Sequence, residues 1–191
     1  AVFPGGRVDP DDYMLAETLA PGLERDDAAA RIAAIRETLE ETGIAIGIAQ
    51  DGKRPAASVL DPARDALNGG ALFSTMLAEL GWSLDLASFI PWSRWRPPGS
   101  LETRVFDARF YIADAGVARL EGVADQTENT SLFWASAQTV LDRADAGELS
   151  IIFPTRRNLE RLAQFEDFAS ARKHADSVPV RTVLTFVEDR D

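Results

Sequence analysis

Three glutamates, Glu37, Glu40 and Glu41, are spaced so that a helix would carry them on one face. At about 100° per residue, side chains at i, i+3 and i+4 fall within an arc of roughly 100°. Like charges at this spacing repel, and in the last turn of a helix they also oppose the helix dipole. A divalent metal ion would relieve both effects, and clustered carboxylates that leave room for water and phosphate suit Mg²⁺ or Mn²⁺. An ordinary solvated acidic face is the alternative.

The element that must position these acids is a helix predicted over residues 26–42, with Asp26 or Asp27 as its N-terminal cap. Gly43 follows the last turn and should end the helix in the left-handed conformation. An apolar stripe on the side opposite the acids should attach the helix to a core, and it consists of Ile32, Ile35 and Leu39.

The run from Arg36 to Ile44 resembles the core of the Nudix box. In that family the box reads Gly, five residues, Glu, seven residues and then Arg-Glu-U-x-Glu-Glu-x-Gly-U, in which U is aliphatic. Thr38 stands where an aliphatic residue is usual. The positions that match are Arg36, Glu37, Glu40, Glu41, Gly43 and Ile44.

The front of the box allows two alignments. In the first, Gly6 and five residues lead to Asp12, a carboxylate in place of the usual Glu, and 16 extra residues then precede the arginine. In the second, Gly22 leads to Ala28 without an insertion, which puts Ala where the family has Glu. We favour the first, because the two glycines directly follow Phe-Pro and because residues 13–23 form a self-contained excursion that ends in Pro-Gly.

With an insertion within the box, the chain resembles one Nudix branch, which includes peroxisomal coenzyme A diphosphatases. Residues 104–111 and 128–134 also look like that branch. The resemblance implies an α/β fold, a Nudix-type α/β/α sandwich with a mixed sheet and a helical insertion. It also implies a hydrolase that uses Mg²⁺ or Mn²⁺ to cleave a diphosphate linkage in a small nucleoside diphosphate derivative. Coenzyme A or an acyl-coenzyme A is the expected substrate, and ADP-ribose or another nucleotide sugar is the alternative.

Diphosphate hydrolysis requires positive charge and an oriented water molecule near a phosphorus atom that negative oxygens surround, and bound metal ions supply both. By the resemblance, Arg36 holds the glutamates in place, a role that suits a planar guanidinium. Glu40 and Glu41 are the expected metal ligands, and Glu37 shares in metal binding or orients a ligand. The further candidates for substrate binding are Gly5, Gly6, Trp95 and Glu128.

Each of these further candidates also has a structural explanation. Glycines would let the backbone approach a metal ion or phosphate closely, but Gly-Gly after Phe-Pro is often a plain turn. Trp95 lies between Arg94 and Arg96 and could stack on adenine, although core packing commonly explains a tryptophan. Glu128 could be an additional metal ligand, a general base or a solvated loop acid.

The composition restricts the class of protein. A chain of 191 residues with 46% hydrophobic content suits one globular domain over residues 1–191. The net charge of -11 argues against nucleic acid or a membrane as a partner, so a small molecule is expected. Without cysteine the chain has no thiol nucleophile, and its single histidine, His174, is expected on a helix surface rather than in a catalytic triad.

The chain shows no signal peptide or membrane-length apolar run, which favours a cytoplasmic protein. Nudix domains normally place a strand before the Phe-Pro-Gly-Gly run, so we expect an N-terminal strand to be missing from this chain. Two short helices within residues 61–80, broken at 68–70, could form a lid, a dimer element or packing, and a homodimer is left open. The other predicted elements are a short strand or extended segment at 44–49, strands at 105–113, 132–135 and 180–187, and helices at 136–146 and from 154 onward.

Two hypotheses do not involve catalysis. The chain could be a nucleotide-binding module that keeps the fold, or a structural domain whose acidic helix face is accidental. Three mutually repelling acids argue against the first, because binding alone does not require them, although the interrupted box and Asp12 leave it open. The second would require the arginine, the acids and the glycine to occur together by chance.

Overall fold

The computed structural model describes residues 3–96, 107–116 and 132–184. The chain forms two compact units. The first, the helical unit, contains Pro4–Phe89 and Ala113–Trp134. The second, the sheet unit, contains Ala1–Phe3, Ile90–Ile112 and Ala135–Asp191. The organisation of residues 1–191 as one domain stays a prediction.

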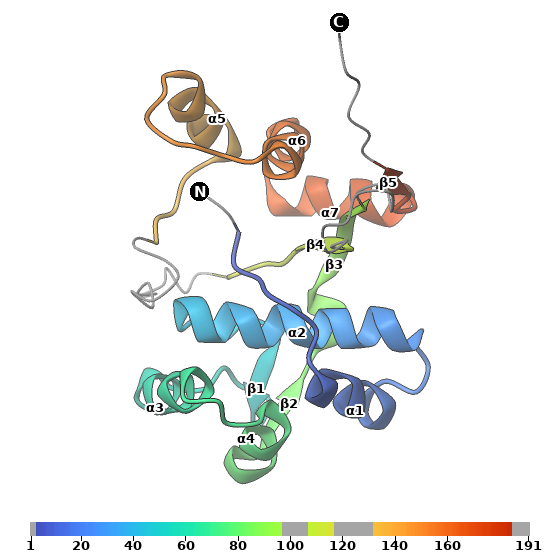
Figure 1. Ribbon diagram of the computed structural model, residues 1–191, viewed down its shortest axis with the longest axis vertical. Helices are drawn as coiled ribbons and strands as arrows, with labels where there is room; N and C mark the ends of the chain where they lie inside the picture. Colours follow the sequence, from blue (N-terminus) through green and yellow to red (C-terminus); the bar gives the residue numbers. More distant parts are fainter. Residues whose placement is uncertain (1–2, 97–106, 117–131, 185–191) are drawn as a thin grey trace, which may run out of the picture. The chain divides into compact units, whose positions relative to one another are not determined.

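The helical unit is built on α2 (Arg25–Thr42), and α1 (Pro10–Leu19) and α3 (Ala57–Asn68) both pack against this helix (Figure 1). A fourth helix, α4 (Phe73–Leu80), contacts α1. The strands β1 (Ile48–Gln50) and β2 (Trp82–Leu84) pair antiparallel, and the 3₁₀ turn η1 (Leu86–Ser88) follows them. The two helices predicted within 61–80 are therefore confirmed, whereas the strand expected at 44–49 begins only at Ile48.

The ends of α2 differ in how well they were predicted. Its apolar stripe, Ile32, Ile35 and Leu39, is completely buried as expected. Gly43 ends the helix with φ of 71°, and its N–H donates to the Leu39 carbonyl. The predicted cap is wrong: Asp26 and Asp27 lie inside the first turn, and the carboxylate of Glu24 accepts their N–H groups at 3.0 and 2.9 Å. Arg25 is already helical, so the capping position lies one residue before it.

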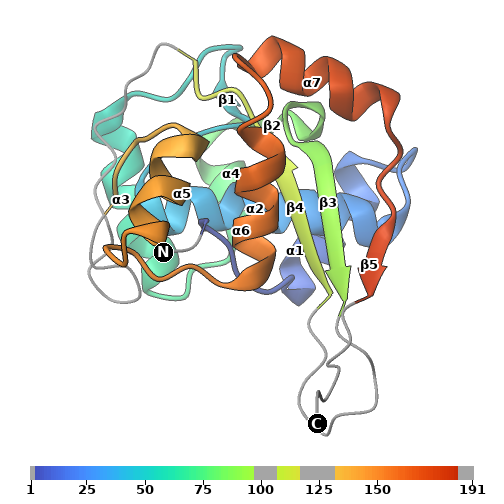
Figure 2. The same ribbon diagram turned by 90° about the horizontal axis from the view of Figure 1, so that it is seen from above.

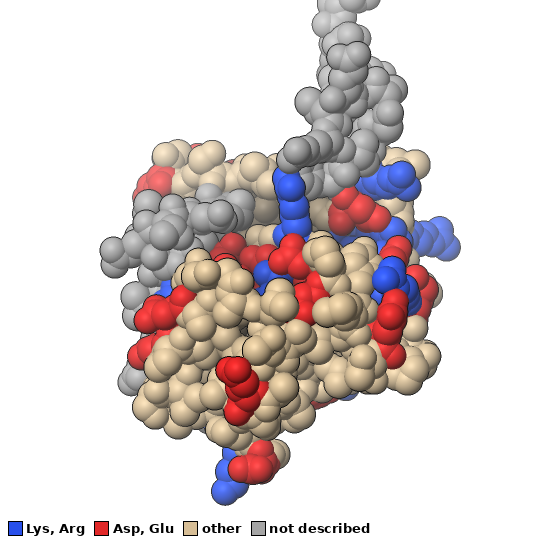
Figure 3. Space-filling view, turned by 60° about the horizontal axis from the view of Figure 1, so that its bottom comes forward, with Lys and Arg blue, Asp and Glu red and all other residues tan. Residues whose placement is uncertain are grey.

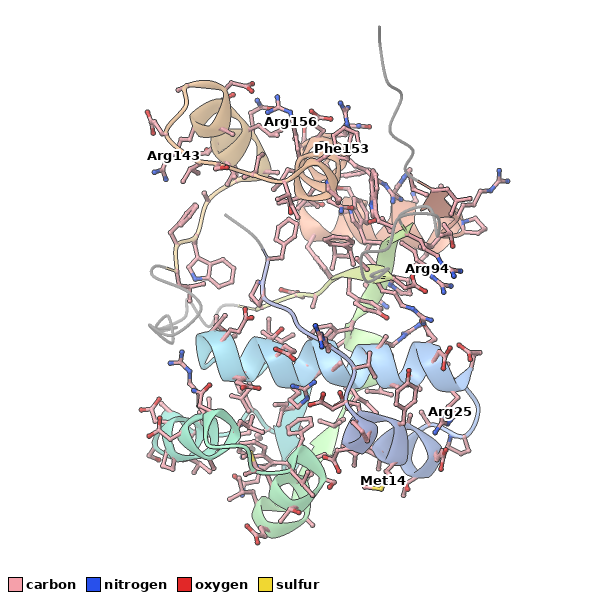
Figure 4. All side chains as sticks on the ribbon, in the orientation of Figure 1. Met14, Arg25, Arg94, Arg143, Phe153 and Arg156 are labelled. Carbon is pink, nitrogen blue, oxygen red and sulfur yellow. The ribbon has the colours of Figure 1, made fainter. Side chains whose placement is uncertain are left out.

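The excursion before α2 contains a helix that the sequence did not predict. Pro10 opens α1 at the first helical position, where its missing N–H costs nothing. The backbone N–H of Asp9 donates to Asp12 Oδ2 at 2.9 Å, which caps the first turn. Arg25 lies where α1 leads into α2 (Figure 4), and its Nε donates to Glu17 Oε1 at 2.7 Å. The insertion is thus an ordered helical hairpin with α2.

The sheet unit contains a three-stranded sheet in which β3 (Ile90–Arg96) is the central strand (Figure 2). Its neighbours are β4 (Ala108–Ile112), which is antiparallel, and β5 (Thr182–Leu184), which is parallel. The helices of this unit are α5 (Ala137–Asp145), α6 (Phe153–Leu162) and α7 (Phe168–Ser177). The α/β class with a mixed sheet is confirmed, as are the strand within 105–113 and the helix that Ser136 caps.

Trp92 is the centre of packing in the sheet unit. It is 2% exposed, and the Arg161 guanidinium lies 3.9 Å from the centroid of its ring. His174, on α7, packs against Trp92 and Phe165 and is half-buried rather than free on a helix surface. Arg156 joins the first two helices of this unit, since it donates to Asp145 at 2.7 Å (Figure 4).

The strand predicted at 132–135 is wrong. These residues have no strand pairing, and Phe133 and Trp134 are 40% and 60% exposed. A short apolar run forms a strand only where a neighbour accepts its backbone hydrogen bonds. The strand predicted at 180–187 is present as Thr182–Leu184 in the described part.

No helix in the described ranges is long and apolar enough to cross a membrane. On the face that Figure 3 shows, acidic and basic side chains lie beside one another, and large areas between them are uncharged. The excess of acidic residues is therefore not gathered into one patch on the described residues of that face.

Candidate functional site

Arg36 is the centre of a polar cluster in the helical unit. Its Nε donates to Asp12 Oδ1 at 3.2 Å and its Nη2 to Asp12 Oδ2 at 2.9 Å. Only 8% of the Arg36 side chain is exposed, and the Asp12 side chain is completely buried. A two-point pair of this kind fixes the plane of the guanidinium, so α1 sets the orientation of a side chain on α2.

The Nη1 group of Arg36 faces two of the predicted site residues. Nη1 donates to Glu37 Oε1 at 2.8 Å and lies 3.5 Å from Glu40 Oε2, while Nη2 also donates to the Arg7 carbonyl at 2.8 Å. Burial alone would lower the pKa of Arg36, but Asp12 and the charge of Glu37 raise it well above its ordinary value. Arg36 therefore remains a cation and balances part of the acidic face.

The surroundings of Glu37 disfavour its charged form. Burial raises the pKa of its carboxyl, and the charges of Glu40 and Asp9 act in the same direction. The charge and the hydrogen bond of Arg36 oppose them but do not cancel the effect. The carboxylate of Glu37 is thus held at an energetic cost, which a nearby positive charge would reduce.

The two glycines contact the same cluster. The N–H of Gly5 donates to Glu41 Oε2 at 3.3 Å. Gly6 passes so close to Glu37 that a Cβ on it would overlap the carboxylate, whereas a Cβ on Gly5 would meet open space. An alanine at position 6 would therefore force the Glu37 carboxylate to move, whereas an alanine at position 5 would not.

Arg64 also reaches this cluster, and the sequence did not indicate it. From α3, its Nε donates to the carbonyl of Glu40 at 2.8 Å and its Nη2 to that of Glu41 at 2.9 Å. The contact joins residues 23 and 24 positions apart, so no local pattern reveals it.

The structure therefore brings together most of the predicted site residues and leaves others elsewhere. The cluster in the helical unit contains Gly5, Gly6, Asp12, Arg36, Glu37, Glu40 and Glu41. Trp95 lies on β3 in the sheet unit, where its Nε1 donates to Ser93 Oγ at 3.1 Å and its ring meets the edge of Phe153. Glu128 lies outside the described residues.

The geometry favours the alignment of the box with the insertion. Asp12 makes the two-point contact with Arg36, whereas Ala28 is a completely buried methyl group that has no oxygen to offer. The aspartate therefore stands where the box pattern has its first glutamate.

The donor set suits a hard divalent cation, because it consists of carboxylate oxygens next to exposed backbone. In the described part of the chain, no three such side chains already converge on one point. Glu37 and Glu40 face Arg36, and Glu41 accepts from Gly5. These residues fit a metal ion in their chemistry.

Residues 16–162 match the family model described as the NUDT19 Nudix domain. The chain belongs to the Nudix hydrolase family. The matched residues include the end of the box from Arg36 onward, whereas Gly5, Gly6 and Asp12 precede them. Enzymes of this family generally use divalent metal ions.

Three relatives agree with this membership. Acyl-coenzyme A diphosphatase NUDT19 from Gallus gallus is 28% identical over 165 residues, which cover 77% of this chain and 44% of the relative. Putative nudix hydrolase 7 from Caenorhabditis elegans is 26% identical over 178 residues, which cover 92% and 54%. The chain thus spans about half the length of these relatives. A crystal structure of a Nudix hydrolase from Alicyclobacillus acidocaldarius has a TM-score of 0.75 at 27% identity and covers 90% of this chain and 79% of that one.

Proposed function

We propose that this protein is a diphosphatase that cleaves coenzyme A or an acyl-coenzyme A in the presence of Mg²⁺ or Mn²⁺. The observation that carries the proposal is the network around Arg36, which holds acidic side chains at the spacing of a Nudix box. The insertion within the box and the similarity to a protein named acyl-coenzyme A diphosphatase support the choice of substrate.

Glu37, Glu40 and Glu41 would hold the metal ion. When bound, a divalent cation offsets the negative charge of the diphosphate and makes a bound water molecule more acidic. The acids alone would repel such a substrate, so the reaction depends on how this chain arranges its positive and negative groups.

Arg36 would act as a positioning residue rather than contact the substrate. Asp12 takes two of its donors, which leaves Nη1 to orient the carboxylates of Glu37 and Glu40. The N–H of Gly5 restrains Glu41 from the opposite end of the box. The close passage of Gly6 over Glu37 would keep a side chain out of the space that phosphate oxygens need.

The leaving group is selected outside the box, because the same box serves many diphosphates. Trp95 and Glu128 remain candidates for contacts with the nucleotide. A cytoplasmic location and a homodimer also stay predictions from the sequence.

A product assay tests the proposal. The full-length protein is incubated with coenzyme A, an acyl-coenzyme A, ADP-ribose and dinucleotide polyphosphates, each with Mg²⁺ or Mn²⁺, and the products are identified by mass. We expect 3′,5′-ADP and a phosphopantetheine from the coenzyme A substrates. AMP from ADP-ribose alone would instead indicate a nucleotide-sugar enzyme. If no substrate is cleaved in a metal-dependent way, a nucleotide-binding module becomes the better hypothesis.

A further inference from the structure

The C-terminal end of α2 carries both Glu40 and Glu41, so the backbone there fixes where their side chains start. The last carbonyls of a helix lack partners within the helix. Here the Leu39 carbonyl accepts from Gly43, and the N–H of Ile44 donates to Thr42 Oγ1 at 3.1 Å. The carbonyls of Glu40 and Glu41 follow in this last turn, and both accept hydrogen bonds from a side chain outside α2.

Arg64 provides that side chain. It donates to both carbonyls, at 2.8 and 2.9 Å, and places a positive charge at the negative end of the helix dipole. The last turn of α2 has no basic residue of its own, while it does carry acids. One side chain therefore satisfies two carbonyls and offsets an unfavourable charge arrangement.

Helix α3 holds Arg64 in place. A buried stripe on α3, made of Leu60, Ala63 and Leu67, flanks Arg64, and α3 packs against α2. The next helix, α4, is joined to α1, because the buried carboxylate of Asp11 accepts from the N–H and the hydroxyl of Ser74 at 2.8 and 2.5 Å. Ser74 lies in the first turn of α4, whose N-terminal cap, Leu72, offers no side-chain acceptor.

Two adjacent residues of α1 therefore contact the two neighbouring helices, α2 and α4. Asp12 binds Arg36 on α2, and Asp11 caps α4. Together with Arg64, these contacts support α2 near its centre and at its C-terminal end. Helices α1 and α3 thus stabilise the helix that carries the acids.

We propose that Arg64 is a positioning residue that keeps the last turn of α2 formed, and with it the side chains of Glu40 and Glu41 oriented for a divalent cation. The inference rests on the proposed function, because the orientation of Glu40 and Glu41 matters only if they bind a metal ion. The hydrogen bonds that keep the turn formed do not depend on it.

Two measurements on Arg64→Ala test the proposal: amide hydrogen exchange across residues 39–45 in metal-free protein, and the dissociation constant for Mn²⁺ by calorimetry. We expect exchange of these amides to become about tenfold faster or more, because two hydrogen bonds to a charged donor are lost. We expect the Mn²⁺ dissociation constant to rise about tenfold, as is usual when a residue that orients ligands is removed.

Arg31→Ala is the matched control. Arg31 also lies on α2 and donates to a carbonyl, that of Leu86 at 3.2 Å, but it is far from the C-terminal turn in sequence and pairs with Asp27. We expect this variant to lower the melting temperature while exchange at 39–45 and Mn²⁺ affinity stay unchanged.

Unchanged exchange and Mn²⁺ affinity in Arg64→Ala would overturn the inference, as would an equal loss of affinity in Arg31→Ala, which would indicate general destabilisation. If the wild-type protein binds no Mn²⁺, the metal site of the proposed function fails. Hydrogen exchange alone then decides whether Arg64 holds the turn.

Discussion

Asp12 and Arg36 form a buried two-point ion pair between helices, although 24 positions separate them in the chain. The insertion in the box therefore does not separate its two parts in space. It returns α2 to the carboxylate at the start of α1, so the first acid of the box and its arginine are in contact.

Asp12→Asn should destabilise the fold, because Arg36 would keep its charge in a buried place and lose the carboxylate that balances it. Breaking a buried ion pair from one side costs about 3 kcal/mol or more, and we expect about 3 kcal/mol here because Glu37 and Glu40 remain. Urea denaturation measures the loss. Asp65→Asn, at an exposed position of α3, is the control and should change the free energy of unfolding by less than about 0.5 kcal/mol. A loss of the same small size in Asp12→Asn would show that the pair is not important for stability.

The free energy of unfolding of Glu37→Gln should increase relative to that of the wild type as the pH rises. The pKa of Glu37 is raised by burial, so the folded state binds this proton more tightly than the unfolded state does. Its contribution to stability is present below about pH 4 and is lost as the pH rises through the folded pKa. Glutamine does not ionise and avoids this loss. Unfolding free energies of both proteins in metal-free buffer between about pH 4 and 7 test the sign. A variant that loses stability relative to the wild type as the pH rises would contradict it.

Gly6→Ala should disturb the site, whereas Gly5→Ala should not. An added Cβ on Gly6 overlaps the Glu37 carboxylate and must displace it from Arg36, while the same change on Gly5 meets open space and keeps the N–H that binds Glu41. Loss of a hydrogen bond between charged groups suggests a cost of about 1.5 kcal/mol for the first variant. Thermal unfolding and Mn²⁺ titration of both variants measure the effects. Equal behaviour of the two would show that Gly6 has no special steric role.

The local parts of this site could be predicted from the sequence, and the tertiary parts could not. The stripe of α2 and its end at Gly43 follow from the helical period and from the conformational freedom of glycine, which act within a few residues. The contact of Arg64 with the end of α2 depends on where α3 packs, and nothing near Arg64 indicates it.

Two errors have different origins. Glu24 was missed as the cap because the preferred capping residues Asp26 and Asp27 follow it closely. The strand at 132–135 was predicted from its apolar residues alone, yet a strand requires a partner that the sequence does not identify.

The turnover of coenzyme A at increasing Mg²⁺ concentration, compared between wild type and Glu40→Gln, tests the central claim most directly. Glu40 is partly exposed beside Arg36, so the substitution should leave the melting temperature nearly unchanged. A metal ion lowers the reaction barrier by several kcal/mol, so we expect turnover to fall by about a hundredfold or more. Glu79→Gln, at an exposed position of α4, should keep wild-type turnover. Full activity in Glu40→Gln, or turnover by the wild type that does not depend on added metal, would contradict the account.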